Sequence, residues 1–132
     1  FLGWFMTATG MIFIDRKNRS KATQSLKDAA ALIANGKTVL IFPEGTVSSN
    51  GEIQKFKKGG FHLALEAGVD ILPISLKGTN TIWSDESNIK FKPGKVQVNI
   101  GKPISIDDYT NDQLNDLTFK VKSNIESLQK LN

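Results

Sequence analysis

The chain has 132 residues, the length of one domain, and its composition of 39% hydrophobic and 23% charged residues is typical of a globular protein rather than a disordered one. It has no cysteine, which excludes a disulfide framework, a thiolate zinc site and a cysteine nucleophile. The net charge of +4 fits a partner that carries phosphate, anionic lipid or acidic side chains, but many soluble domains have the same small excess.

The N-terminal segment, residues 1–14, has no charged side chain. It is too short for a membrane-spanning helix, which needs about 20 apolar residues. It lacks the basic start of a signal peptide. We expect a chain that is truncated at its N-terminus, whose first apolar side chains lie either at a membrane interface or on the domain core.

The first predicted elements alternate between strand and helix. Residues 11–14 form an apolar run that predicts a strand buried on both faces. Apolar residues at helical spacing predict a helix over 20–35, and Gly36 follows as its terminator. Residues 38–42 predict a second buried strand, which ends at Pro43 because proline cannot donate to a ladder.

The same alternation continues along the chain. A short helix is predicted over residues 61–67, closed by Gly68. Residues 71–76 form a third apolar run, in which Pro73 favours an edge position or a bulge. Residues 95–100 alternate between polar and apolar side chains, as in a half-exposed strand.

A final amphipathic helix is predicted over residues 114–128, after a capping box formed by Thr110 and Gln113. The order of these elements is that of an α/β protein. We therefore predict one domain over residues 1–132, with a mostly parallel central sheet flanked by helices and a C-terminal amphipathic helix.

The segment after the second predicted strand is the strongest local signal for chemistry. It reads Phe42, Pro43, Glu44, Gly45, Thr46. Ligands of open α/β sheets sit beyond the carboxyl ends of the strands. There, Gly45 allows a sharp turn, Thr46 offers a hydroxyl, and Glu44 can accept hydrogen bonds from a hydroxylated substrate or orient a base. The alternative is a strand-ending turn with a solvated glutamate.

Charged residues follow the other predicted strand end and the glycine-rich loop. Asp15 and Arg16 come directly after the first strand, and a guanidinium there suits a phosphate. Lys55, Lys57 and Lys58 could add positive potential to the same rim. Each lysine taken singly can equally be an ordinary surface charge.

These segments, in this order, resemble the sequence blocks of the glycerol-phosphate and lysophosphatidate acyltransferase superfamily. Residues 10–16 resemble its second block, residues 42–48 its third, usually Phe-Pro-Glu-Gly-Thr-Arg-Ser, and residues 71–75 its fourth. Residues 18–36 and 56–68 are also similar to the family, and the resemblance covers about residues 1–78.

The resemblance implies an O-acyltransferase of phospholipid biosynthesis. It implies transfer of a fatty acyl group from acyl-CoA or acyl carrier protein to the free hydroxyl of lysophosphatidate, at the cytoplasmic face of a membrane and without a cofactor. In the family a His acts as general base and an Asp orients it. That block is expected upstream of Phe1, so we predict no catalytic residue in this chain and no activity of this fragment alone.

The resemblance also implies which residues touch the substrate. The predicted substrate-binding residues are Asp15, Arg16, Phe42, Pro43, Glu44, Gly45, Thr46 and Lys57. The one histidine, His62, is not the family's base, because the fifth residue after it is Ala67 rather than Asp. It shares a helix face with Glu66, but apolar neighbours favour a structural histidine.

One departure from the family pattern leaves other functions open. Val47 stands where the family has the Arg that is thought to contact the acceptor phosphate, so an acceptor with another head group is possible. A non-catalytic membrane-surface module is a further alternative. We propose no metal site, because the acids are scattered and one His cannot form a zinc cluster. No nucleic-acid partner is expected, because the lysines are not interleaved with exposed aromatics.

Overall fold

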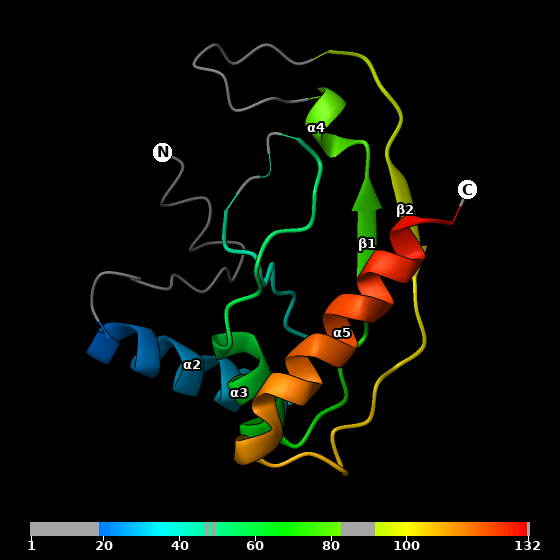
Figure 1. The fold of residues 1–132 in the computed structure, drawn as a ribbon. Coiled ribbons are helices and arrows are strands. Elements are labelled where there is room, and N and C mark those ends of the chain that lie inside the picture. Colours follow the sequence, from blue (N-terminus) through cyan, green and yellow to red (C-terminus); the bar gives the residue numbers. More distant parts are fainter. Residues whose placement is uncertain (1–18, 47, 49, 83–91, 132) are drawn as a thin grey trace. The chain divides into compact units, whose positions relative to one another are not determined.

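The computed structural model describes residues 19–46, 48, 50–82 and 92–131 (Figure 1). The chain divides into two compact units, residues 1–41 and 42–132, and each is described by itself. The organisation as one domain stays a prediction. No helix in the described ranges is long and apolar enough to cross a bilayer.

The first unit contains the helix α2, Arg19–Ala34, as predicted. It ends in a left-handed glycine, because Gly36 has a φ of 75°. The Lys37 N–H reaches back over this turn and donates to the Leu32 carbonyl at 3.0 Å, and the same carbonyl accepts the Asn35 N–H at 3.2 Å. The glycine was therefore a correct stop signal.

The predicted buried strand over residues 38–42 is not a strand in the structure. These residues have no regular secondary structure, and Leu40 and Phe42 are 71% and 66% exposed. A strand needs a neighbour that takes up its N–H and C=O groups. No described ladder includes these residues, so the apolar run alone was insufficient to form one.

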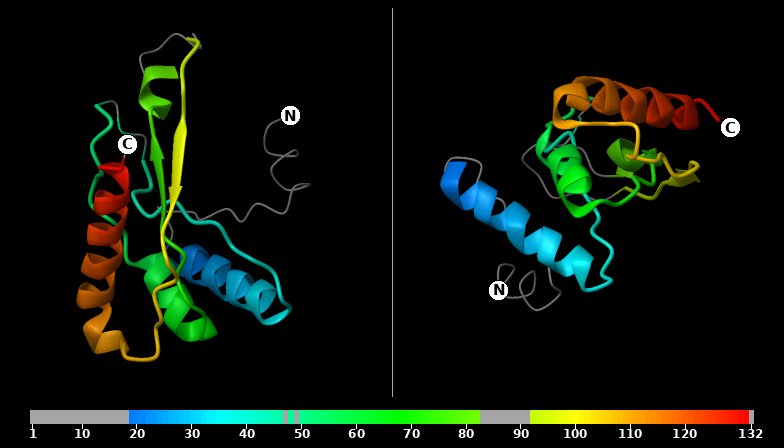
Figure 2. Two further views of the ribbon diagram at one scale, coloured as in Figure 1. Left: turned by 90° about the vertical axis from the view of Figure 1, so that its right-hand side faces the viewer. Right: turned by 90° about the horizontal axis from the view of Figure 1, so that it is seen from below.

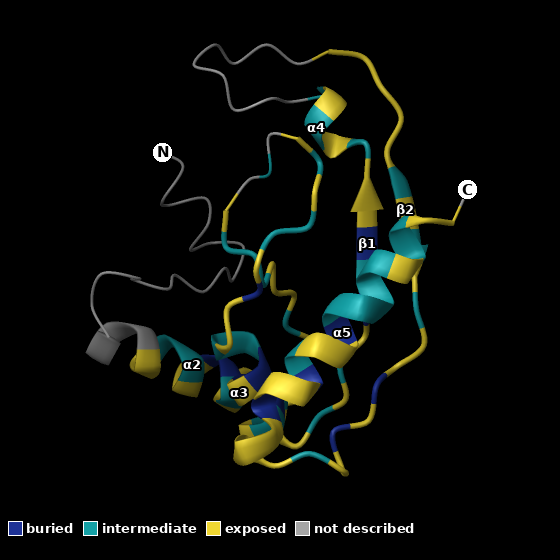
Figure 3. Cartoon of the chain, in the orientation of Figure 1, coloured by how far each residue is buried: buried dark blue, intermediate teal, exposed yellow. Residues whose placement is uncertain are grey.

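The core of the second unit lies between two helices, α3 (Gly59–Ala67) and α5 (Leu114–Gln129). Figure 3 shows buried residues on both helices, and all of them except Leu63 belong to one apolar cluster. Its buried members are Phe56, Phe61, Ala64, Ile104, Ile106, Leu114, Leu117 and Val121. The helical spacing of the last three confirms the predicted amphipathic stripe.

Both helices begin or end as the sequence predicts. Gly68 closes α3 in the left-handed conformation, with a φ of 64°. Before α5 lies a short 3₁₀ helix, η1 (Asn111–Gln113). There the Gln113 side-chain oxygen accepts the Thr110 N–H at 3.1 Å, which confirms the capping box.

The sheet of the described residues has two antiparallel strands, β1 (Ile74–Lys77) and β2 (Gln97–Ile100). The short helix α4 (Thr79–Ile82), which the sequence did not predict, lies between them in the chain. This differs from the mostly parallel central sheet that we predicted. The reason is that one predicted strand, residues 11–14, lies outside the described residues and another, residues 38–42, pairs with no described strand.

The predicted strand over 71–76 is interrupted at its proline. Ile71 pairs with Ile104 in an isolated bridge, and regular pairing begins only at Ile74, opposite Ile100. Pro73 lies between and has no N–H to donate, although its carbonyl accepts the Gly101 N–H at 2.9 Å. This is the irregularity that the proline indicated.

The helix α5 runs alongside the ladder and contacts its polar row (Figure 2). The Asn99 amide donates to the Leu128 carbonyl at 2.8 Å, and the Gln97 amide donates to the Leu131 carbonyl at 3.2 Å. On the other face of β2, Val98 and Ile100 are 54% and 64% exposed. The strand is half-exposed, as predicted, and its polar side is the one that packs.

Candidate substrate-binding site

Residues 42–46, the segment with the strongest sequence signal, form a tight turn at the start of the second unit. The Gly45 N–H donates to the Phe42 carbonyl at 3.1 Å, so Pro43 and Glu44 are the central residues of a four-residue turn. Proline favours the first central position of such a turn because its φ is already set. Gly45 itself has a φ of 64°, a backbone conformation that residues other than glycine rarely adopt. The motif therefore encodes a sharp reversal.

Two further hydrogen bonds hold this turn against residues 54–57. The Glu44 carboxylate accepts the Gln54 N–H at 2.7 Å through Oε2. The Pro43 carbonyl accepts the Lys57 N–H, also at 2.7 Å. The turn thus meets a segment that is ten or more residues away in the sequence, and it does so through backbone groups of that segment.

An aromatic side chain anchors the same segment in the core. Phe56 is buried and stacks on Phe61 of α3, with the ring centroids 6.2 Å apart and the ring planes at 17°. Because Phe56 lies between Gln54 and Lys57, the two hydrogen bonds join the turn to a fixed part of the fold. We call residues 42–46 and 54–57 together the turn site.

The loop between the two parts of the turn site has its own polar contacts. Asn50 accepts the Ser48 hydroxyl at 2.9 Å and donates to the Glu52 carboxylate at 2.8 Å. The Gln129 side chain of α5 donates to the Gly51 carbonyl at 3.2 Å. The described loop residues are therefore joined to one another by these bonds, and Gly51 is linked to the final helix.

Exposed lysines border the turn site. Lys55, Lys57 and Lys58 are all exposed. In the described part of the chain, the one ion pair joins Lys122 to Glu126 at 3.6 Å, so no described carboxylate neutralises these three lysines. The turn site thus contains the threonine Thr46, the Glu44 carboxylate and lysines that no described carboxylate neutralises.

The structure brings together six of the eight predicted site residues. Phe42, Pro43, Glu44, Gly45, Thr46 and Lys57 all belong to the turn site. Asp15 and Arg16 lie outside the described residues, as does Val47, so the meeting of Arg16 with Glu44 stays a prediction. The sequence did not indicate Gln54 or Phe56, because a backbone N–H and a core side chain carry no chemical signature.

His62 is exposed rather than enclosed by its apolar neighbours, and the structural role predicted for it stays a prediction. Its ring nitrogen Nδ1 lies 3.1 Å from Oδ1 of Asn111, which joins α3 to η1 on an exposed surface. This contact is made to an amide, and Glu66 takes no part in it.

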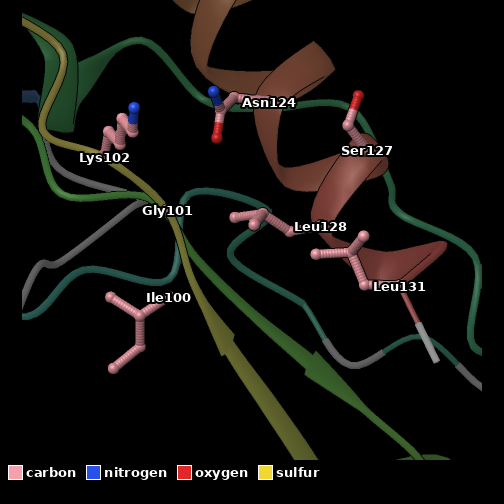
Figure 4. A pocket seen from close by; sticks show the side chains of 7 residues that line it. All are labelled: Ile100, Gly101, Lys102, Asn124, Ser127, Leu128 and Leu131. Atoms are coloured by element: carbon pink, nitrogen blue, oxygen red, sulfur yellow. The ribbon is translucent and has the colours of Figure 1, made fainter.

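A shallow pocket of about 410 Å³ lies elsewhere, between the end of β2 and the last turns of α5 (Figure 4). It is lined by Ile100, Gly101, Lys102, Asn124, Ser127, Leu128 and Leu131. None of the predicted site residues lines it, so this pocket is separate from the turn site.

Comparison with protein families identifies the chain. The family model described as "Acyltransferase" matches residues 1–77, more than half of the sequence. This match includes the turn at Glu44, the Lys57 segment, α3 and the first part of the ladder.

Several similar proteins are named 1-acyl-sn-glycerol-3-phosphate acyltransferases. The 1-acyl-sn-glycerol-3-phosphate acyltransferase of Saccharomyces cerevisiae is 36% identical over 135 residues, which cover 99% of this chain and 44% of the relative. That of Limnanthes alba is 40% identical over 116 residues, 87% of this chain and 41% of the relative. The alpha form of Mus musculus is 36% identical over 114 residues, 86% of this chain and 40% of the relative.

A solved structure has a similar fold. The crystal structure of the 1-acyl-sn-glycerophosphate (LPA) acyltransferase PlsC from Thermotoga maritima matches with a TM-score of 0.76 and 28% identity. The match covers 99% of this chain and 52% of that one. The chain spans less than half the length of the curated relatives described above. The family model, the relatives and this fold confirm the resemblance seen in the sequence: the chain belongs to the acyltransferase family.

Proposed function

We propose that the protein acts as an O-acyltransferase in phospholipid biosynthesis, with lysophosphatidate as acceptor and acyl-CoA or acyl carrier protein as donor. The observation that carries this proposal is the match of nearly the whole chain to proteins that are named 1-acyl-sn-glycerol-3-phosphate acyltransferases. The proposal includes work at the cytoplasmic face of a membrane, where both a lysolipid and a water-soluble donor are accessible.

The reaction needs a base that this chain is not expected to contain. The acceptor hydroxyl attacks the thioester carbonyl, a C–O bond forms, the C–S bond breaks, and the donor leaves as a thiol. A histidine paired with an aspartate takes the hydroxyl proton in the family. We expect that block upstream of Phe1, and the turn site then supplies acceptor binding rather than proton transfer.

Positive charge at the turn site supports a phosphate-bearing acceptor. Lys57 is exposed and is attached through its backbone to Pro43, so its ammonium can approach a phosphate beside the turn. We propose that it does so in place of the Arg that the family has where this chain has Val47, while the role of Arg16 stays a prediction from the sequence.

The intact protein tests this assignment. Lys57→Ala should raise KM for lysophosphatidate roughly tenfold, because hydrogen bonds to charged groups contribute about 1.5–3 kcal/mol. The matched control is Lys120→Ala, which removes an exposed lysine of α5 and should leave KM unchanged. Equal KM values for both variants would refute the role of Lys57.

Val47 favours a second candidate within the same reaction class, an acyltransferase for a lysolipid without a terminal phosphate. A panel of lysophosphatidate and lysolipids with amino head groups distinguishes the two. Preference for lysophosphatidate dismisses the second candidate. If the intact protein acylates none of them yet binds anionic vesicles, the non-catalytic membrane-surface module is the better description.

We keep the mostly parallel central sheet as a proposal for the intact enzyme. The support is that residues 38–42 form an apolar run whose backbone N–H groups find no described acceptor. Slow amide hydrogen exchange over these residues in the intact protein would agree with a paired strand. Fast exchange would contradict it.

A further inference from the structure

We propose that Glu44 is a positioning residue, whose carboxylate fixes the turn to the Lys57 segment and does not itself bind the acceptor. Its effect on the reaction, which rests on the proposed function, passes through Lys57. The hydrogen bonds of the turn site carry this inference.

The carboxylate has a defined partner within the protein. Oε2 of Glu44 accepts the Gln54 N–H at 2.7 Å, and the contact is partly buried. A carboxylate that accepts a backbone N–H forms a stronger hydrogen bond than a neutral acceptor does. If the carboxylate is removed, the Gln54 N–H loses its acceptor in a site where water has limited access.

A second hydrogen bond fixes the orientation of residues 54–57 relative to the turn. The Pro43 carbonyl accepts the Lys57 N–H at 2.7 Å, three residues after Gln54. Two bonds from adjacent turn residues to one segment restrain both its distance and its rotation. Phe56, which lies between the two bonded residues, is held in the core against Phe61. The backbone of Lys57 is therefore fixed while its side chain remains exposed.

The chemistry of the bond separates positioning from substrate binding. A backbone N–H needs one acceptor oxygen within reach, and a glutamine side chain has one at the same distance from the backbone. A charge-dependent role would be lost in glutamine. Aspartate keeps the charge but is shorter by one methylene group. If Glu44→Gln has a KM closer to the wild type than Glu44→Asp has, Glu44 acts by positioning. If Glu44→Asp has the KM closer to the wild type, the negative charge itself has a role.

Steady-state kinetics of the intact enzyme with lysophosphatidate give the first readout. Glu44→Ala should raise KM roughly tenfold with little change in kcat, as Lys57→Ala does. Glu44→Gln should stay within about threefold of the wild type, and Glu44→Asp should resemble Glu44→Ala. The double variant Glu44→Ala/Lys57→Ala should be no worse than Lys57→Ala. Glu66→Ala removes an exposed acid of α3 and serves as the matched control.

Hydrogen exchange of the Gln54 amide gives a second readout that needs no activity. We expect protection in the wild type and in Glu44→Gln, and about tenfold faster exchange in Glu44→Ala and Glu44→Asp. If Glu44→Gln loses kcat while the Gln54 amide stays protected, Glu44 acts on the substrate and the proposal is overturned. If the wild type does not acylate lysophosphatidate but the amide shows this pattern, only the proposed function fails.

Discussion

The core between α3 and α5 and the turn site are held together by different forces. The core is an apolar cluster in which Leu117 is fully buried. The turn site is held by two hydrogen bonds in which oxygen atoms of the turn accept backbone N–H groups. Apolar burial contributes most of the stability of a domain, whereas a hydrogen bond contributes about 0.5–1.5 kcal/mol net. The comparison suggests that the core sets stability and the turn site sets geometry.

The largest expected effect is on the core. Leu117→Ala removes a side chain with no exposed surface, and such cavities cost about 2–5 kcal/mol. Urea denaturation of this chain should show that loss in the free energy of unfolding. In the intact enzyme, the fraction that remains folded should keep the wild-type KM for lysophosphatidate. A changed KM in folded protein would mean that core and turn site are not separable.

Phe56 tests the point where the two regions meet. Phe56→Leu keeps an apolar side chain but loses the stacking on Phe61, and we expect about 1–2 kcal/mol of destabilisation. Because Phe56 lies between Gln54 and Lys57, the Gln54 amide should also exchange faster. Leu63→Met provides a matched control in α3, since Leu63 is buried without belonging to the turn site. If it accelerates exchange of the Gln54 amide equally, the effect of Phe56 is not specific.

At the turn we expect a small loss of stability and a change in KM, the reverse of the result expected for Leu117→Ala. Gly45 has a left-handed backbone conformation, in which a residue with a Cβ atom costs roughly 1–2 kcal/mol more than glycine. Gly45→Ala should therefore destabilise the chain by about 1 kcal/mol, yet raise KM of the intact enzyme severalfold by displacing the turn. Gly36→Ala makes the same change at a similar φ, at the end of α2. It should show the loss of stability without the change in KM.

The same contrast explains how much the sequence could predict. The stop at Gly36, the capping box at Thr110 and the stripe along α5 depend on residues close in the sequence, and all three predictions are confirmed. The strand over residues 38–42 depends on partners elsewhere in the chain, and that prediction is wrong for the described structure. In a helix cap or an amphipathic stripe the interacting residues are close in the sequence, whereas the strands of a parallel ladder are far apart in it.

The candidate site follows the same division. The turn at Glu44 was predictable because proline and glycine occupy the positions that a tight reversal requires. It was not predictable that the Gln54 N–H would donate to the Glu44 carboxylate, since any residue other than proline offers the same N–H. The meeting with Arg16 depends on two strand ends and stays a prediction.

The smallest effect is expected on the exposed row of the ladder. Val98 is 54% exposed on β2, whereas Val121 is buried in α5 at 3% exposure. Substitution of either by threonine exchanges a methyl group for a hydroxyl at nearly constant volume. At Val98 the hydroxyl remains hydrated, so we expect a change within about 0.5 kcal/mol. At Val121 the hydroxyl enters the apolar cluster, so we expect a loss of about 1–3 kcal/mol. Urea denaturation of both variants measures the difference, and equal losses would show that the apolar face of β2 is covered in solution.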